Sequence, residues 1–220
     1  GAGAAELQSG PIDGRYQIQD VLGEGGMGVV YRAYDEFKDR TVAVKVLRAA
    51  LTSQGDDEAL ARFRREATLT FKLREHPGVV QVFDAGTIQP AGQLFYVMAY
   101  VDGTSLSRKI STGLAHGEGA WLVAQVARAV AYAHEQGVIH RDLKPANVLV
   151  AKSGVVLLAD FGVARFLDDE QSRLTVSGAA LGTPSYMAPE QIEDAKQAGP
   201  LADVYGLGAI LYAALTGKAP

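Results

Sequence analysis

The sequence contains no cysteine, which already limits the chemistry that its 220 residues can carry out. Without thiols the chain can form no disulfide, no thiolate zinc site and no cysteine nucleophile. It also lacks an excess of positive charge, because 21 Lys and Arg residues stand against 25 Asp and Glu residues, giving a net charge of −4. A protein that binds nucleic acid without sequence preference needs surplus cations to displace counterions, so we expect no nucleic-acid partner.

Long hydrophobic runs are missing as well. The longest uncharged apolar stretch, residues 204–217, contains three glycines and is shorter than the roughly 18 to 20 residues that a membrane span needs. Residues 1–10 have neither a basic region nor an apolar core, so they lack the pattern of a signal peptide. We therefore expect this segment to be cytoplasmic and to make no membrane contact, while an anchor beyond Pro220 stays open.

What is present is the composition of an ordinary folded protein, with 48% hydrophobic and 21% charged residues, which excludes intrinsic disorder. Small residues dominate the start, so residues 1–13 are predicted to be a flexible leader. β-rich runs continue to about Val101, and helical patterns follow. The sequence thus predicts one domain over residues 14–220, with an N-terminal lobe of residues 14–101 and a partial C-terminal lobe of residues 102–220.

The expected strands are rich in aromatic and β-branched residues and are separated by turn residues. They cover residues 16–22, 29–34, 41–47, 79–84, 94–101, 148–150 and 155–158. Apolar residues at helical spacing predict a helix over residues 56–74. Strongly apolar runs predict two more, over residues 121–136 and 203–215. The stretch from Phe161 to Ala188 has no sustained period and is rich in Gly, Ser and Thr, so we expect a long functional loop there.

Three glycines, Gly23, Gly25 and Gly28, have the spacing G-x-G-x-x-G. Glycine has no Cβ, so the backbone at these positions can approach phosphate groups closely. The pattern alone is weak, because ordinary turns also contain several glycines. A dinucleotide-binding loop would open a helix, whereas a strand-like run follows here, which favours a flap over a nucleotide.

Lys45 lies in an alternating strand-like run, where a lone lysine usually faces solvent. Glu66 lies at the edge of the apolar stripe of the helix predicted over residues 56–74, where an unpaired carboxylate would be costly to desolvate. An ion pair between Lys45 and Glu66 would satisfy both groups and would hold the ammonium group ready for phosphate oxygens.

The most specific pattern is the string H-R-D-L-K-P-A-N over residues 140–147, followed by D-F-G at residues 160–162. With these motifs, and with the glycine loop and the lysine before them, the sequence resembles the protein kinase superfamily over nearly all of residues 14–220. It is most similar to the eukaryotic-type (Hanks-type) serine/threonine kinases of bacteria. The Lys144-Pro145 dipeptide is the form found in Ser/Thr rather than Tyr kinases.

The resemblance implies a role for each chemical group of these motifs. Asp142 would accept the proton of the substrate hydroxyl group, and Lys144 would neutralise the phosphoryl group during transfer. Asn147 and Asp160 would hold Mg²⁺, a cation that prefers oxygen ligands and keeps several waters. His140 is expected to be a packed histidine with a structural duty.

Nucleotide-binding residues are implied in the same way, with Lys45 holding the α- and β-phosphates of ATP. The residues that match the family's apolar sandwich around adenine and its hinge are Val30, Ala43, Leu149, Met98, Ala99 and Val101. Met98 corresponds to the gatekeeper, and Ala99 replaces an acidic residue that is common at its position. Because the family binds adenine through backbone groups of Ala99 and Val101, this replacement is not expected to affect ATP binding.

Residues 160–190 correspond to the activation segment of the family. Thr175 and Ser177 precede Thr183 by the distance at which related bacterial kinases carry regulatory phosphates. A phosphate there would pair with Arg141 and order the segment, whereas the alternative is a solvated Ser/Thr in a loop.

Three further features match the family's peptide-docking side. Thr183 fits the substrate-docking threonine of Ser/Thr kinases, and residues 188–190 are the A-P-E signature. Asp203 matches the aspartate that supports the catalytic loop from below.

The implied fold is α+β: the bilobal protein-kinase fold, with an antiparallel N-lobe of five strands and one helix, a mainly helical C-lobe, and ATP between the lobes. The implied function is transfer of the γ-phosphoryl group of ATP, with Mg²⁺, to Ser and Thr hydroxyl groups of proteins, including the chain's own activation segment. The expected partners are therefore protein substrates and, for trans-autophosphorylation, a second copy of the chain.

Two alternatives stay open. A pseudokinase that acts as a binding module usually lacks the lysine or one of the two aspartates, and Lys45, Asp142 and Asp160 are all present. A small-molecule kinase of the same fold is disfavoured by the peptide-docking motifs of residues 182–184 and 188–190.

The C-lobe is expected to be truncated after the central buried helix, because kinases of this family continue for several more helices. In the family the glutamate corresponding to Glu190 pairs with an arginine from that later part. We therefore expect Glu190 to have no inherited partner within residues 1–220 and the lower lobe to be marginally stable.

Overall fold

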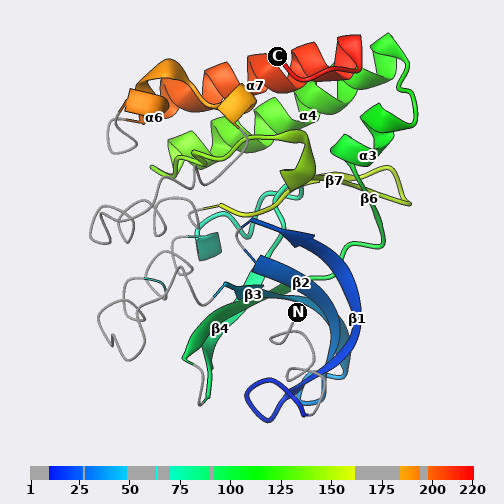
Figure 1. The fold of residues 1–220 in the computed structure, drawn as a ribbon, viewed down its shortest axis with the longest axis vertical. Coiled ribbons are helices and arrows are strands. Elements are labelled where there is room, and N and C mark those ends of the chain that lie inside the picture. Colours follow the sequence, from blue (N-terminus) through cyan, green and yellow to red (C-terminus); the bar gives the residue numbers. More distant parts are fainter. Residues whose placement is uncertain are drawn as a thin grey trace. The chain divides into compact units, whose positions relative to one another are not determined.

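The computed structural model of the chain describes residues 10–26, 28–48, 63, 70–89, 92–161, 184–193 and 198–220. These residues form two compact units, whose elements are labelled in Figure 1. The first unit is drawn from residues 1–67 and 81–100, and the second from residues 68–80 and 101–220.

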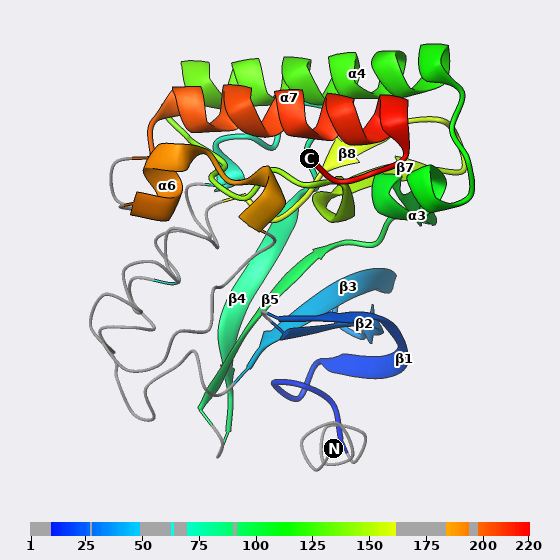
Figure 2. The same cartoon turned by 45° about the horizontal axis from the view of Figure 1, so that its top comes forward.

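A five-stranded sheet makes up most of the first unit (Figure 2). Its strands are β1 (Tyr16–Gly25), β2 (Gly28–Asp35), β3 (Arg40–Leu47), β4 (Val82–Ile88) and β5 (Gln93–Ala99). They lie in the order β1-β2-β3-β5-β4, and every neighbouring pair is antiparallel. The predicted antiparallel sheet of the N-lobe is confirmed. The helix predicted beside it, over residues 56–74, is described only at Phe63 and residues 70–74.

One face of this sheet carries a hydrophobic core. Side chains alternate along a strand, so β3 directs Val42, Val44 and Val46 to the same face, where all three are buried. Their partners in this cluster are Ile12, Tyr16, Tyr31, Ala33, Phe95 and Val97. Ile12 is buried although residues 1–13 are predicted to be a flexible leader, so packed structure begins before residue 14.

The second unit combines a small sheet with helices (Figures 1 and 2). Its strands are β6 (Gly103–Ser105), β7 (Val148–Ala151) and β8 (Val156–Leu158). Its helices are α3 (Leu106–Ser111), α4 (His116–Glu135), α6 (Pro189–Glu193) and α7 (Pro200–Thr216), with 3-10 turns η3 (Pro145–Asn147) and η4 (Pro184–Tyr186). A mainly helical C-lobe was predicted, and this unit has that character.

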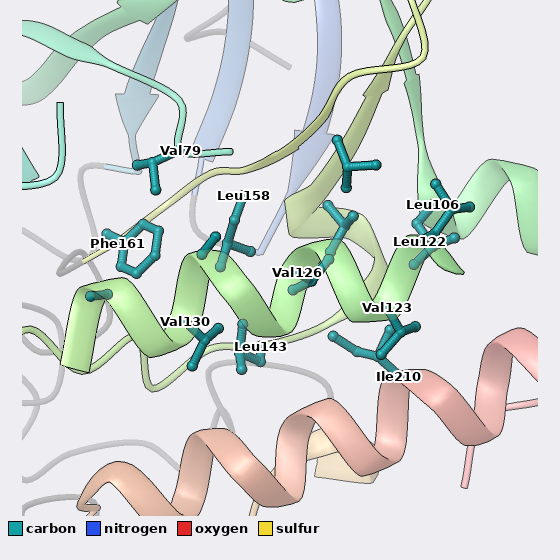
Figure 3. Packing of buried hydrophobic residues seen from close by; sticks show 14 of the residues in the cluster. Val79, Leu106, Leu122, Val123, Val126, Val130, Leu143, Leu158, Phe161 and Ile210 are labelled. Atoms are coloured by element: carbon teal, nitrogen blue, oxygen red, sulfur yellow. The ribbon is translucent and has the colours of Figure 1, made fainter. Parts of the chain in front are cut away.

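Helices α4 and α7 lie side by side, and α4 runs through the second core. Val79, Leu158 and Phe161 lie on one side of α4, and Leu143 and Ile210 lie on the other, toward α7 (Figure 3). The apolar stripe of α4 buries Leu122, Val126 and Val130, because residues three and four apart share one helical face. Figure 3 shows the side chain of Leu143 beside that of Val130, in the space between α4 and α7. Leu143, the residue after Asp142, therefore anchors the loop that carries Asp142 in this core.

Glycines end both long helices. Gly137 follows α4 with φ 74°, and Gly217 follows α7 with the same φ and donates its N–H to the carbonyl oxygen of Ala213 at 2.9 Å. Left-handed backbone at this position favours glycine because other residues are strained there. The start of α7 at Pro200, three residues before the predicted start, uses proline at the first helical turn, where no N–H partner is required.

The described residues also differ from the expected elements over residues 68–84. Residues 68–80, which were assigned to the N-lobe, group with the second unit. The reason is packing: Leu73 and Val79 belong to the core around α4, and the N–H of Val80 donates to the carbonyl oxygen of Leu158 at 3.0 Å. The predicted strand of residues 79–84 accordingly begins only at Val82. Within the described ranges, no helix has the length and hydropathy that a membrane span requires.

Candidate active site

The loop that carries the H-R-D motif has a strained backbone. Arg141 has φ 65°, in the left-handed region that non-glycine residues rarely adopt, at a cost of about 1–3 kcal/mol. The Asp203 carboxylate on α7 opposes that strain by accepting the N–H of His140 and the N–H of Arg141, each at 2.8 Å. With a relative exposure of 1%, this carboxylate is shielded from water, which strengthens both bonds.

A third donor reaches the same carboxylate from α4. His134 Nε2 lies 2.7 Å from Asp203 Oδ2. Three donors on one buried carboxylate satisfy most of its hydrogen-bonding capacity. Asp203 therefore connects α4, α7 and the catalytic loop, which agrees with the supporting role expected for it.

His140 is buried and bonds at both ring nitrogens. Its Nδ1 lies 3.2 Å from the backbone N–H of Asp142, and its Nε2 lies 2.8 Å from the carbonyl oxygen of Ala159. An N–H can only donate and a carbonyl oxygen can only accept, so the ring is neutral with its proton on Nε2. The ring also packs on Phe161, with centroids 4.6 Å apart. These bonds fix the ring between the catalytic loop and the D-F-G motif, as a structural histidine.

Two side chains donate hydrogen bonds to Asp142, the ammonium group of Lys144 and the amide group of Asn147. Lys144 Nζ lies 3.0 and 2.7 Å from its two carboxylate oxygens. Asn147 Nδ2 donates to Asp142 Oδ2 at 3.0 Å and to the Asp142 carbonyl oxygen at 2.8 Å. The structure thus brings Asp142, Lys144 and Asn147 together in one cluster whose carboxylate can accept a proton.

Asn147 and Asp160 fit the oxygen ligands of a divalent cation. The N–H of Ala159 donates to the Asn147 carbonyl oxygen at 2.9 Å, which brings the residue before Asp160 next to Asn147. Both side-chain hydrogen bonds of Asn147 to Asp142 use its amide nitrogen, so neither occupies its side-chain oxygen. Two oxygen-bearing side chains suit Mg²⁺, which relies on waters and phosphates for its remaining ligands.

In the first unit, strand register places several predicted nucleotide-binding residues on one face. Lys45 lies opposite Val30 on β2 and opposite Tyr96 on β5. Ala43, two residues before Lys45, lies opposite Met98. Directly opposite residues in antiparallel strands, and residues two apart in one strand, share a face. These residues therefore lie on the face opposite to the core of Val42, Val44 and Val46.

Lys45 is buried on that face, with 7% relative exposure, rather than solvent-facing. Its Nζ lies 5.9 Å from the ring centroid of Tyr96, within reach of a cation–π interaction. Phe63 contacts the same ring, with centroids 6.2 Å apart. The ammonium group is thus held in a restricted environment beside the strand that carries Met98.

Only one of the three motif glycines is required by packing. A Cβ on Gly28 would lie 2.0 Å from the carbonyl oxygen of Val46, so any other residue would displace β3. A Cβ on Gly23 or Gly25 would meet nothing within 4 Å. Packing does not explain glycine at those two positions, whereas close approach of a phosphate would.

Of the remaining predicted site residues, one lies in the first unit, two lie in the second unit, and the others lie outside the described ranges. Ala99 ends β5, and its N–H donates to the carbonyl oxygen of Gln81 at 2.9 Å, which leaves its carbonyl group as the part that could bind a base. Val101 and Leu149 belong to the second unit, Leu149 on β7. The residues that lie outside the described ranges are Glu66, Thr175, Ser177 and Thr183, so the Lys45–Glu66 pair and the phosphorylation sites stay predictions.

Sequence reasoning missed two residues that support the catalytic loop. One is His134 on α4, which acts through Asp203 rather than by touching the loop. The other is Gln191 on α6, whose Nε2 donates to the carbonyl oxygen of Arg141 at 2.8 Å. No local pattern distinguishes Gln191 from an ordinary surface glutamine.

Comparisons with known proteins agree with this geometry. The family model described as the protein kinase domain matches residues 16–220. The serine/threonine-protein kinase PknB of Mycolicibacterium smegmatis is 41% identical over 95% of this chain, and PknB of Mycobacterium tuberculosis is 40% identical over 95%. In both cases the chain spans 33% of the relative's length.

A solved structure is similar as well. The kinase domain of PknI from M. tuberculosis matches with a TM-score of 0.76 and 32% identity, covering 97% of this chain and 76% of that one. The expected fold class, an antiparallel N-lobe with a mainly helical C-lobe, is confirmed by this likeness.

Proposed function

Because this chain belongs to the protein kinase family, we propose that it transfers the γ-phosphoryl group of ATP to serine and threonine hydroxyl groups of proteins. The observation that carries the proposal is the Asp142 carboxylate, held between Lys144 Nζ and Asn147 Nδ2 on a loop supported by Asp203. Phosphoryl transfer needs little covalent help, so positioned charge of this kind is the main catalytic requirement.

Each group in the cluster has a proposed role. Asp142 accepts the proton that leaves the substrate hydroxyl group, and Lys144, already beside that carboxylate, neutralises charge on the transferring phosphoryl group. Asn147 and Asp160 hold Mg²⁺ through their side-chain oxygens. When bound, the cation offsets the negative charge of the ATP phosphates.

The residues proposed to hold ATP itself come mainly from the first unit. Lys45 binds the α- and β-phosphates, with Glu66 as its ion-pair partner, and Gly23, Gly25 and Gly28 allow backbone N–H groups to approach phosphate. The residues proposed to contact adenine are Val30, Ala43, Met98, Ala99, Val101 and Leu149. The burial of Lys45 beside Tyr96 supports this assignment, because a buried ammonium group needs anionic partners.

Protein substrates with Ser or Thr are the proposed partners, and a second copy of the chain is one of them. We propose that the chain phosphorylates Thr175 and Ser177 in trans, in the cytoplasm. The environment of Arg141 supports its proposed pairing with a phosphate on these residues. Its Nε is buried and has no hydrogen-bond partner among the residues that the structure describes.

Transfer of labelled γ-phosphate from Mg-ATP to a generic basic protein tests the proposal. We expect incorporation at Ser and Thr residues of the added protein and of the chain itself. ATP binding without any transfer would instead indicate a pseudokinase, and transfer restricted to small molecules would indicate a small-molecule kinase. Phosphosite mapping by mass spectrometry identifies transfer to protein, while nucleotide titration and transfer to small-molecule acceptors distinguish the other two outcomes.

A further inference from the structure

We propose that Gln191 is a positioning residue for phosphoryl transfer, which acts by holding the peptide unit between Arg141 and Asp142. This inference rests on the proposed function. Gln191 belongs to none of the motifs that indicate a kinase, and it lies on the short helix α6 that follows residues 184–188.

The side-chain amide of Gln191 bonds on both sides. Its Nε2 donates to the carbonyl oxygen of Arg141 at 2.8 Å, and its Oε1 accepts the N–H of Ala188 at 3.2 Å. A carbonyl oxygen can only accept and a backbone N–H can only donate, so these partners determine which way the amide faces. Gln191 thus bridges the segment before α6 and the catalytic loop, across 50 positions of sequence.

The bridge acts on the peptide unit that directly precedes the Cα of Asp142. The carbonyl group of this unit accepts from Gln191, and its N–H, which belongs to Asp142, donates to His140 Nδ1 at 3.2 Å. Both polar ends of this peptide unit are therefore bonded, the carbonyl group to α6 and the N–H to the buried ring of His140 in the same loop. Rotation of this unit would break two hydrogen bonds at once.

The strained backbone of Arg141 explains why the peptide unit between Arg141 and Asp142 needs to be restrained. With φ 65°, Arg141 is in a conformation that non-glycine residues leave when they can. Asp203 restrains the peptide before Arg141 by accepting its N–H at 2.8 Å, and Gln191 restrains the peptide after it. Without Gln191, the loop can relax on the side that carries Asp142.

Such a relaxation would move the catalytic carboxylate while leaving the nucleotide-binding residues of the first unit unchanged. A misplacement of about 1 Å at a reacting group can cost about 100-fold in rate. Loss of the bridge should therefore lower kcat and leave KM for ATP unchanged. A residue that served stability alone would lower the fraction of folded protein and would not separate the two constants.

Two variants and a matched control test the proposal. Gln191→Glu keeps the shape and the acceptor for Ala188 N–H but faces the Arg141 carbonyl oxygen with a second acceptor. Gln191→Met removes both hydrogen bonds at similar volume. Glu193→Gln changes an exposed residue of the same helix and serves as the control.

We expect kcat to fall about 10- to 100-fold in both Gln191 variants, with KM for ATP within about twofold of the parent and thermal melts showing folded protein. Amide hydrogen exchange supplies a readout that does not depend on activity. The segment of residues 140–143 should exchange faster in both Gln191 variants than in the parent, and at the parental rate in Glu193→Gln.

Three results would overturn the proposal. The first is parental kcat in folded Gln191 variants, the second is a loss of activity that only follows the unfolded fraction, and the third is unchanged exchange of residues 140–143, which would show that Gln191 does not hold this peptide. If the parent itself transfers no phosphate, the proposed function fails and with it the catalytic role of Gln191, while the exchange measurement still decides whether the hold exists.

Discussion

Asp142 is placed for proton transfer by Lys144 and Asn147 before any substrate is bound. We predict that Asp142→Asn keeps the fold and the ATP affinity but lowers kcat by about 10²- to 10⁴-fold, because an amide cannot accept the hydroxyl proton. This loss corresponds to roughly 3–5 kcal/mol of transition-state stabilisation. Steady-state kinetics and nucleotide titration measure the two constants separately.

Asp102→Asn is the control for that change, since Asp102 forms an exposed ion pair with Lys152 at 2.9 Å. It should leave kcat unchanged. If Asp142→Asn retained full transfer activity, the assignment of the base would be wrong.

A second carboxylate, Asp35, is fully buried in the first unit. It accepts from Arg15 Nε at 2.7 Å and Nη2 at 2.8 Å, and Arg40 Nε lies 3.6 Å away. The paired guanidinium of Arg15 lowers the pKa of Asp35 below its usual value, because it stabilises the charged form. Arg15 also contacts Asp84, so this cluster links the start of β1 to β2 and β4.

The lowered pKa of Asp35 predicts acid sensitivity. A carboxylate whose pKa is lower in the folded protein than in the unfolded chain stabilises the fold at pH values above its unfolded pKa of about 4. This stabilisation is lost as the pH falls through the pKa of the folded protein. We expect Arg15→Met to cost about 3 kcal/mol of unfolding free energy at neutral pH, at the lower end of the range for a broken buried pair because Arg40 remains. It should also weaken the dependence of stability on pH below about 4. Urea denaturation across pH measures both effects.

The exposed pair of Arg48 and Glu24, 3.2 Å apart, provides the comparison. Arg48→Met should change stability by less than about 1 kcal/mol, as for most surface pairs. Equal losses in the two variants would contradict the special role of the buried cluster.

At the scale of elements, α7 approaches the catalytic loop closely at Gly206. A Cβ on Gly206 would lie 2.8 Å from Leu143 Cβ, whereas a Cβ on Gly208 would meet nothing within 4 Å. Since Leu143 follows Asp142 directly, bulk at Gly206 should displace the catalytic residue. Figure 3 shows the position of Leu143 between α4 and α7.

We predict opposite effects for alanine at these two glycines. Gly206→Ala should destabilise by about 1–3 kcal/mol through overpacking, partly offset by better helix propensity, and should lower kcat. Gly208→Ala should stabilise by up to about 1 kcal/mol with unchanged kcat. Chemical denaturation and kinetics on the two variants check this, and a stabilised, fully active Gly206→Ala would contradict the close packing.

Residues 160–190 yield a prediction that connects the proposed phosphorylation sites to Arg141. Thr175→Ala with Ser177→Ala should lower activity, and Arg141→Gln should lower it too, because the phosphates are proposed to pair with that guanidinium group. If they act together, adding Arg141→Gln to the double alanine variant should cause little further loss. Independent, additive losses, or full activity of the double variant when the parent is phosphorylated at these sites, would contradict the pairing.

At the scale of the whole molecule, local composition allowed the larger elements to be predicted. Runs rich in aromatic and β-branched residues identified the strands that became β1, β2 and β3, and strongly apolar runs identified α4 and α7. The short β6 and α3 were missed, since three and six residues are too few to show a period. The grouping of residues 68–80 with the helices could not be predicted, because it depends on packing against α4.

In the candidate site as well, local sequence patterns indicated some residues, whereas others could be found only from tertiary contacts. Lys45 and Ala43 could be assigned to one face from alternation alone, and motif resemblance identified Asp142, Asn147 and Asp203. His134 and Gln191 were missed because their bonds to Asp203 and Arg141 span 69 and 50 positions of sequence. Contacts of this range follow from tertiary packing, and no spacing rule along the chain indicates them.

The outer side of α7 carries several exposed apolar side chains. Leu201 is 76% exposed, and Val204, Tyr205 and Tyr212 are also exposed. Their spacing of three, four and seven residues places them on one stripe of the helix, while Ala202, Ile210 and others on the opposite side face the core. Contiguous exposed apolar surface promotes association, so we expect the 220-residue chain to self-associate through this stripe.

Neutral substitutions test that expectation without adding charge near the buried Asp203. Leu201→Gln combined with Tyr212→Gln should reduce association, measured by sedimentation velocity over a range of concentrations, because both side chains lie on the exposed stripe. Phe37→Gln in the first unit removes a side chain that is 73% exposed and is the control. If association depends on the α7 stripe, the Phe37 variant should associate as the parent does. Dispersal by Phe37→Gln alone would instead place the contact on the first unit, since α7 would then be exposed without driving association.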